Sequence, residues 1–191
     1  MRRRSLALRL ATGLVLSGCL AGGAFGQAVG NPPSSEYDVK AVFLYHFTRY
    51  VAWPEDAPAE AVSIVVFGES EITAPLLEIA KKKTVGPKPL LVRQCLDPTQ
   101  IGRPQILFIA KSETARLAQI LKETEGKDVL TVGEAAGLAR EQGVAVNFVL
   151  REEAVKFEIS EKAVSKTRLK IGSQLLKLAI LVDAREGKIR P

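Results

Sequence analysis

The chain has 191 residues, of which 47% are hydrophobic and 25% are charged, and its formal net charge is +6. This length and composition predict one globular domain and exclude a disordered chain. Four of the 27 basic residues are arginines that precede residue 27, in a stretch without Asp or Glu, and the other 23 face 21 acidic residues. The near balance of charge after residue 26 argues against a nucleic-acid partner.

Residues 1–26 have the three-part pattern of a secretory signal peptide. An arginine-rich start is followed by an apolar stretch from Leu6 to Leu16 and then by small residues. The small-x-small pattern at residues 24–26 predicts cleavage before Gln27. Such cleavage would leave a soluble protein in the bacterial periplasm.

A second cleavage site is also consistent with the leader. Residues 16–19, Leu-Ser-Gly-Cys, fit a lipobox, in which residues 1–18 would be the signal and Cys19 would be acylated. The mature protein would then be anchored to the membrane through Cys19. An uncleaved anchor is a third reading, but the many Gly and Ala residues make the stretch weakly hydrophobic for a spanning helix.

A linker over residues 27–35 precedes a predicted helix over residues 36–51. Ser35 and Asp38 have the spacing of a capping box that begins the helix, and the proline after Trp53 ends it. One apolar stripe of this helix is expected to face the core, and it consists of Ala41, Leu44, Tyr45 and Thr48.

A second apolar stripe lies about 100° around the same helix. It consists of Val39, Phe43, Phe47 and Tyr50. Large aromatic side chains are typical anchors of protein interfaces, so we expect this stripe to form a dimer or partner interface. The alternative is that the C-terminal helix covers it.

Strands and helices alternate along the rest of the chain. The pattern first predicts a strand over 62–67, a helix over 71–82, strands over 90–92 and 106–109, and a helix from Ser112 to about residue 122. It next predicts a strand over 129–131 and a short helix to residue 141, opened by a second capping box from Thr131 to Glu134. A hairpin of strands 143–150 and 154–159 follows, then a short helix after Ser160 and a longer one over 172–182.

This alternation predicts an α/β fold. We expect a single small domain over residues 36–184, with a mostly parallel sheet, a C-terminal antiparallel hairpin and helices on both faces. Residues 185–191 would form a C-terminal tail.

A ligand crevice is expected at the carboxyl ends of the strands, where open α/β sheets bind their ligands. Gly68, Ser70, Ser112 and Thr131 would collect there and offer hydroxyls and backbone N–H groups to a small polar or anionic molecule. Helix capping is the alternative explanation for all four residues.

Residues for catalysis are scarce. His46 is the sole histidine, and its helical neighbours include no acidic residue that could orient it, as a catalytic triad requires. Cys95 is the only cysteine outside the leader, so no zinc set and no intrachain disulfide can form in a cleaved chain. No phosphate-binding loop occurs either. The sequence therefore predicts a protein that is not an enzyme and that uses no metal or cofactor.

Seven segments carry a resemblance to a known family. They are residues 36–47, 51–54, 106–109 with Ser112-Glu113, 129–132, 146–148, 155–159 and 169–179. In this order and spacing the chain resembles the YfiR-like family of small periplasmic proteins, over about residues 36–182.

The resemblance implies a negative regulator that binds the periplasmic region of an inner-membrane diguanylate cyclase. Repression would lower cyclic di-GMP and disfavour biofilm, and a homodimer is expected. Family members also accompany other membrane sensors, so the partner's identity does not transfer. Redox control through disulfides does not transfer either, because only Cys95 is available. The alternative is a periplasmic sensor that binds a small ligand and reports to a membrane receptor or transporter.

Overall fold

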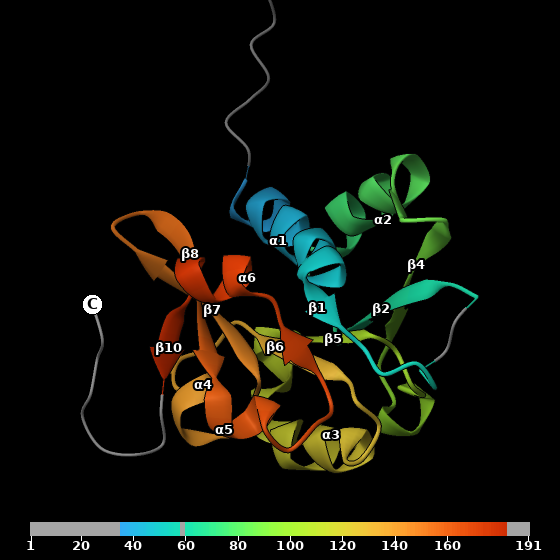
Figure 1. Cartoon of the computed structure of the whole chain (residues 1–191). Helices are drawn as coiled ribbons and strands as arrows, with labels where there is room; N and C mark the ends of the chain where they lie inside the picture. Colours follow the sequence, from blue (N-terminus) through green and yellow to red (C-terminus); the bar gives the residue numbers. More distant parts are fainter. Residues whose placement is uncertain (1–34, 58–59, 183–191) are drawn as a thin grey trace, which may run out of the picture. The chain divides into compact units, whose positions relative to one another are not determined.

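The computed structural model describes residues 35–57 and 60–182, which belong to one compact unit. The expected signal peptide, most of the linker, Cys19 and the tail 185–191 lie outside the described residues. The described part shows the expected fold class, a mostly parallel sheet with helices on both faces (Figure 1).

Eight strands form the main sheet, in the order β10-β8-β7-β6-β5-β2-β4-β3. All neighbours are parallel except the hairpin β7/β8 and the pair β3/β4. The strands are β2 (Val62–Phe67), β3 (Thr84–Val85), β4 (Lys88–Cys95), β5 (Ile106–Ile109), β6 (Leu130–Gly133), β7 (Val146–Arg151), β8 (Ala154–Ser160) and β10 (Ile180–Val182). Two further strands, β1 (Val51–Ala52) and β9 (Lys170–Ile171), pair with each other in antiparallel orientation.

Helices cover both faces of the sheet. One face carries α1 (Glu36–Tyr50), α2 (Thr73–Lys82) and α6 (Ser173–Leu178). The other carries the short 3₁₀ helix η1 (Pro98–Gln100), α3 (Leu117–Thr124) and α4 (Leu138–Glu141). The 3₁₀ helix η2 (Lys111–Arg116) leads into α3, and α5 (Glu161–Val164) follows β8.

Side-chain alternation along the strands divides the core in two. In β2, Ile64 and Val66 pack toward α1 and α2, while Val65 and Phe67 pack toward α3. All four side chains are buried because helices lie on both sides. A strand that is covered on both faces, such as β2, therefore needs apolar residues at consecutive positions.

The start of α1 confirms the first capping box. The Asp38 N–H donates to Ser35 Oγ at 3.1 Å, and the Ser35 N–H donates to the Asp38 carboxylate at 2.8 Å. Ala41, Leu44 and Thr48 are buried, as the first stripe predicts, and Tyr45 is half-buried.

The prediction for the second stripe of α1 is wrong at one residue, Phe47. Phe47 is 1% exposed, stacks on Phe148 and meets the Phe157 ring edge to face, so it belongs to the core and not to a free interface. Phe43 is half-buried beside the same two rings. Lys40, which no stripe included, is also buried on the inner side of the helix.

Two predicted caps are wrong. Thr131 lies inside β6, and α4 instead begins after Gly137, whose φ of 77° suits glycine. Ser112 lies inside η2, and the N-cap of η2 is Ala110, which makes no side-chain cap hydrogen bond. Strand β6 continues through Thr131 to Gly133 because both neighbouring strands, β5 and β7, pair with it there.

The last predicted helix is also shorter than expected. Helix α6 ends at Leu178, and residues 180–182 form strand β10, parallel to β8. The apolar run that predicted one long helix therefore spans helix α6 and the edge strand β10. By contrast, the predicted hairpin is present, and the short helix α5 begins with the Ser160 side chain accepting from the Ala163 N–H.

Candidate binding cleft at the carboxyl edge of the sheet

Strands β2 and β5 lie side by side in the sheet, but the chain leaves them in opposite directions. After β2 it passes through α2 to β4 on one side, and after β5 it passes through η2 and α3 to β6 on the other. Their two loops must therefore diverge. A crevice at such a switch of strand order is the usual ligand site of open α/β sheets.

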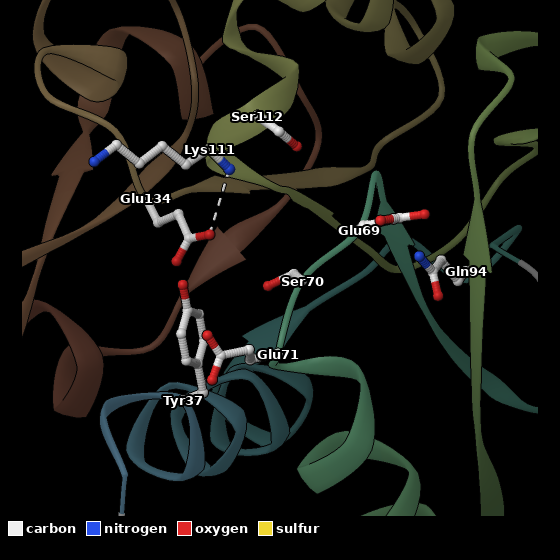
Figure 2. Close-up of a pocket in the computed structure, with 8 residues that line it drawn as sticks. All are labelled: Tyr37, Glu69, Ser70, Glu71, Gln94, Lys111, Ser112 and Glu134. Carbon is white, nitrogen blue, oxygen red and sulfur yellow. Dashed lines mark hydrogen bonds between the residues drawn. The ribbon is translucent and has the colours of Figure 1, made fainter.

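A cleft of about 590 Å³ occupies this position (Figure 2). Residues from α1, from strand β4 and from the segments after β2, β5 and β6 line it. They are Tyr37, Glu69, Ser70, Glu71, Gln94, Lys111, Ser112 and Glu134.

Glu134, which lines the cleft, forms a buried ion pair with Lys40. Lys40 Nζ lies 2.6 Å from Glu134 Oε2, and the two side chains are 6% and 4% exposed. Lys40 Nζ also lies 2.5 Å from Glu36 Oε1, one helical turn away. Burial opposes the charge of Lys40, but the hydrogen bonds to both carboxylates outweigh it, so the pKa of Lys40 is raised.

The second oxygen of Glu134 reaches the start of η2. The Lys111 backbone N–H donates to Glu134 Oε1 at 3.3 Å, as the dashed line in Figure 2 shows. A carboxylate of the chain itself therefore occupies the position that a bound anion would take at the start of this helix. This arrangement disfavours the anionic ligand that the sequence suggested.

The phenol of Tyr37 points toward Glu134 across the cleft in Figure 2, with Glu71 beside its ring. Burial, together with the nearby Glu134 charge, raises the pKa of the Tyr37 phenol. Lys40 lies over the ring, with Nζ 4.7 Å from its centre. Tyr37, Lys40 and Glu134 thus link helix α1 to the carboxyl end of β6.

A second hollow of about 370 Å³ adjoins the first and shares Tyr37, Lys111 and Glu134 with it. Its far wall is less polar, and it consists of Ala135, Ala136, Phe148, Val149 and Leu150. We call the two hollows together the edge groove. Its polar end lies at β2 and β4 and its apolar end at the β7/β8 hairpin.

The four residues predicted for a crevice are only partly together. Ser70 and Ser112 both line the cleft. Gly68 lies just before it, with φ 93° and its carbonyl accepting from Gln94 Nε2 at 2.8 Å. Thr131 is elsewhere, because its side chain is buried within the sheet and accepts from the Ala145 N–H at 2.9 Å.

Sequence reasoning missed the residues that shape the groove most. Lys40 and Glu134 are 94 positions apart, so no local pattern joins them. The one available signal was that Lys40 lies three and four residues before Phe43 and Leu44, beside both apolar stripes, and a buried lysine requires a carboxylate partner.

His46 and Cys95 lie away from the groove. The His46 ring contacts the rings of Tyr45 and Tyr50 on α1. Cys95 is buried, and burial raises the pKa of its thiol, which makes it less reactive. Within residues 35–57 and 60–182, no group of three or more His, Cys, Asp or Glu residues is placed to hold a metal ion. In the same ranges no helix is both long and apolar enough to span a bilayer.

Among solved structures, one of similar fold is the crystal structure of a conserved domain protein from Vibrio cholerae O1 biovar El Tor, with a TM-score of 0.51 and 10% sequence identity. The match covers 78% of this chain and 60% of that protein, so this chain spans less than two thirds of its length. No curated protein matches the sequence.

A family profile supplies the assignment. The profile of the YfiR/HmsC-like proteins matches residues 37–180, a range that contains nearly all of α1, the eight-stranded sheet up to its last strand, and the edge groove. The chain belongs to the YfiR/HmsC-like family, whose members are periplasmic regulators of cyclic di-GMP signalling.

Proposed function

We propose that this protein represses an inner-membrane diguanylate cyclase by binding its periplasmic region, and so lowers cyclic di-GMP. The observation that carries the proposal is the family match over residues 37–180. The chemistry of the described residues agrees with binding, because the polar groups of the edge groove lack a nucleophile paired with a base.

Deletion of the gene tests this proposal. We expect cyclic di-GMP, measured by mass spectrometry of cell extracts, to rise in the deletion strain and to return to its original level on complementation. Co-purification from detergent-solubilised membranes should then recover a protein with a diguanylate cyclase domain. Unchanged cyclic di-GMP in the deletion strain would contradict repression.

We further propose that the mature chain works in the periplasm, after removal of residues 1–26 or after acylation of Cys19. The intact mass of the purified protein separates these forms, because a lipid anchor adds the mass of its acyl chains. A chain that keeps residues 1–26 in the cytosol would contradict both.

The outer face of α1 is the surface that we propose for a homodimer. Val39, Phe43 and Tyr50 remain at least partly exposed after Phe47 is assigned to the core. Val42 joins them, with 46% of its surface exposed. Val39, Val42 and Phe43 line a small, nearly apolar hollow.

Substitution on this face tests the dimer. Val42→Glu should shift the protein from dimer to monomer in sedimentation velocity, while circular dichroism stays native, because the side chain is exposed. Leu96→Glu is a matched control, since Leu96 is 54% exposed but lies after β4. A wild-type monomer, or a Val42→Glu dimer as tight as wild type, would contradict the proposal.

A second candidate function is sensing of a small ligand, and the cleft at the strand switch favours it. Native mass spectrometry of freshly purified protein tests it. A retained metabolite, with no cyclase recovered from membranes, would favour the sensor over the repressor.

A further inference from the structure

We propose that the edge groove receives an extended segment of a partner protein, with a basic side chain at the polar end and an apolar side chain at the hairpin end. The inference rests on the proposed function, because it names the kind of partner segment that the repressor would grip. Three properties of the groove lead to it: its charge, its length and its two unlike ends.

The polar end of the groove is negatively charged. Glu69 and Glu71 are exposed, and neither forms an ion pair with any residue that the structure describes. Glu134 is not counted toward this charge, because it pairs with Lys40, whose ammonium group also pairs with Glu36. In Figure 2 the Lys111 side chain runs past Glu134 and away from Ser70, so its ammonium group does not lie between Glu69 and Glu71. A lysine or arginine of a partner matches this end.

At the opposite end, the wall formed by the hairpin is apolar, although Glu36, Lys40 and Lys111 line the same hollow. Leu150 at the carboxyl end of β7 is 56% exposed, although it lines the groove beside Phe148. The exposed Leu150 side chain gains burial only if another apolar group covers it. A leucine, valine or aromatic side chain of the partner would do so.

The distance between the two ends defines the length of the segment. The groove crosses the carboxyl ends of β4, β2, β5, β6 and β7, which are neighbours in that order. Four spacings of about 4.8 Å make about 19 Å. An extended chain rises about 3.3 Å per residue, so about six residues span it. The basic and the apolar side chain should therefore stand about five positions apart.

A protein segment suits this shape better than a small molecule does. Small-molecule sites usually enclose most of their ligand, whereas both ends of the edge groove present exposed side chains, Glu69 and Glu71 at one end and Leu150 at the other. An anion is disfavoured because Glu134 already occupies the start of η2.

Labelled hexapeptides test the groove without any need for the cyclase. The first probe has the sequence Lys-Ser-Thr-Ser-Thr-Leu, and the second replaces its lysine with glutamate. Fluorescence anisotropy should show binding of the lysine peptide to the wild-type protein with a dissociation constant of about 1 mM or tighter. The glutamate peptide should bind about tenfold more weakly.

Two variants of the protein are measured with the same two peptides. E69K/E71K should reverse the preference and bind the glutamate peptide better, and Leu150→Ser should weaken both peptides. Glu123→Lys on α3 is the control for charge, because Glu123 lines neither hollow and should leave the preference unchanged. Equal binding of the two peptides to wild type, or no binding of either, would overturn the groove proposal.

The same variants in cells keep the two proposals apart. If deletion raises cyclic di-GMP and E69K/E71K does so too, at normal protein level, the groove is the repressing surface. If deletion raises cyclic di-GMP but E69K/E71K and Leu150→Ser repress like wild type, the groove proposal fails and repression stands. If deletion has no effect while the lysine peptide binds selectively, repression fails and the groove stands as a peptide site.

Discussion

Lys40 lines the edge groove and is the counter-charge of the buried Glu134. Its ammonium group neutralises Glu134, whose side chain is 4% exposed. Replacement by an apolar residue of similar length would leave that buried carboxylate without a counter-charge, and removal of one member of a buried ion pair is strongly destabilising.

We therefore expect Lys40→Met to lower the free energy of unfolding by about 3 kcal/mol, measured by urea denaturation. Lys81→Met is the control, because Lys81 also pairs with a glutamate but its side chain is 69% exposed. The control should lose less than about 1 kcal/mol. Equal losses in the two variants would show that burial of the Lys40 pair contributes nothing.

The raised pKa of Lys40 also predicts a pH dependence. A group with a higher pKa in the folded than in the unfolded state contributes stability that is fully present below the unfolded value, here 10.5. That contribution is lost as pH rises through the folded pKa. Tyr37, whose pKa is also raised, changes stability in the same direction above pH 10.0.

Stability of the wild-type protein should accordingly fall as pH increases above about 10, and Lys40→Met should show a shallower fall. Urea midpoints measured between neutral and alkaline pH provide the check. Parallel curves for the two proteins would exclude Lys40 as a source of the alkaline loss.

At the scale of elements, α1 shows how far sequence patterns reach. Its capping box is local, so the spacing of Ser35 and Asp38 was enough to predict where it begins. Its buried side is wider than one stripe, because α1 packs against both α2 and the β7/β8 hairpin. Phe47 is buried and Val42 is exposed because of those distant neighbours, which the periodicity of the helix does not reveal.

Two alanine substitutions on α1 test whether Phe47 belongs to the core and Val42 to the surface. Phe47→Ala should destabilise the protein by about 3 to 5 kcal/mol, because it leaves a cavity between the rings of Phe148 and Phe157. Val42→Ala, on the exposed side, should change stability by less than about 0.5 kcal/mol. Thermal unfolding of both variants measures the difference, and similar melting temperatures would place Phe47 back on the surface.

The boundary between α6 and β10 was also not predictable from the sequence, and the reason here is a different one. Leu175 and Leu178 have helical spacing with Ile180 and Leu181 close behind, so the apolar run reads as one helix. The open edge of β8 decides otherwise, because it offers backbone hydrogen bonds to Ile180–Val182. Secondary structure here follows from tertiary pairing, which overrides local propensity.

For the whole molecule, the alternation of strands and helices predicted the fold class, while the strand order came from the structure alone. The binding edge followed from the fold class, since Ser70 and Ser112 come after parallel strands and do meet there. Thr131 did not join them because its strand extends two residues further, to Gly133. The groove's charge pattern required the three-dimensional positions of Glu134 and Lys40.

Strand β10 closes one edge of the sheet, so its removal should expose β8. A chain that stops after residue 179 should aggregate, because an uncovered strand edge pairs with other chains. A chain that stops after residue 182 is the matched control and should remain monodisperse or dimeric. Light scattering at equal concentrations distinguishes them, and two equally monodisperse proteins would contradict a protective role for β10.

The pairing of β1 with β9 joins the segment after α1 to one more than a hundred residues further along the chain. The backbone N–H of Gly172 reinforces it by donating to the Tyr50 carbonyl at 2.8 Å. During synthesis, residues up to 171 must therefore leave the ribosome before the end of α1 acquires its native neighbours. A nascent chain of this design stays incompletely folded while the residues between β1 and β9 are being made, a state that secretion machinery and chaperones can recognise.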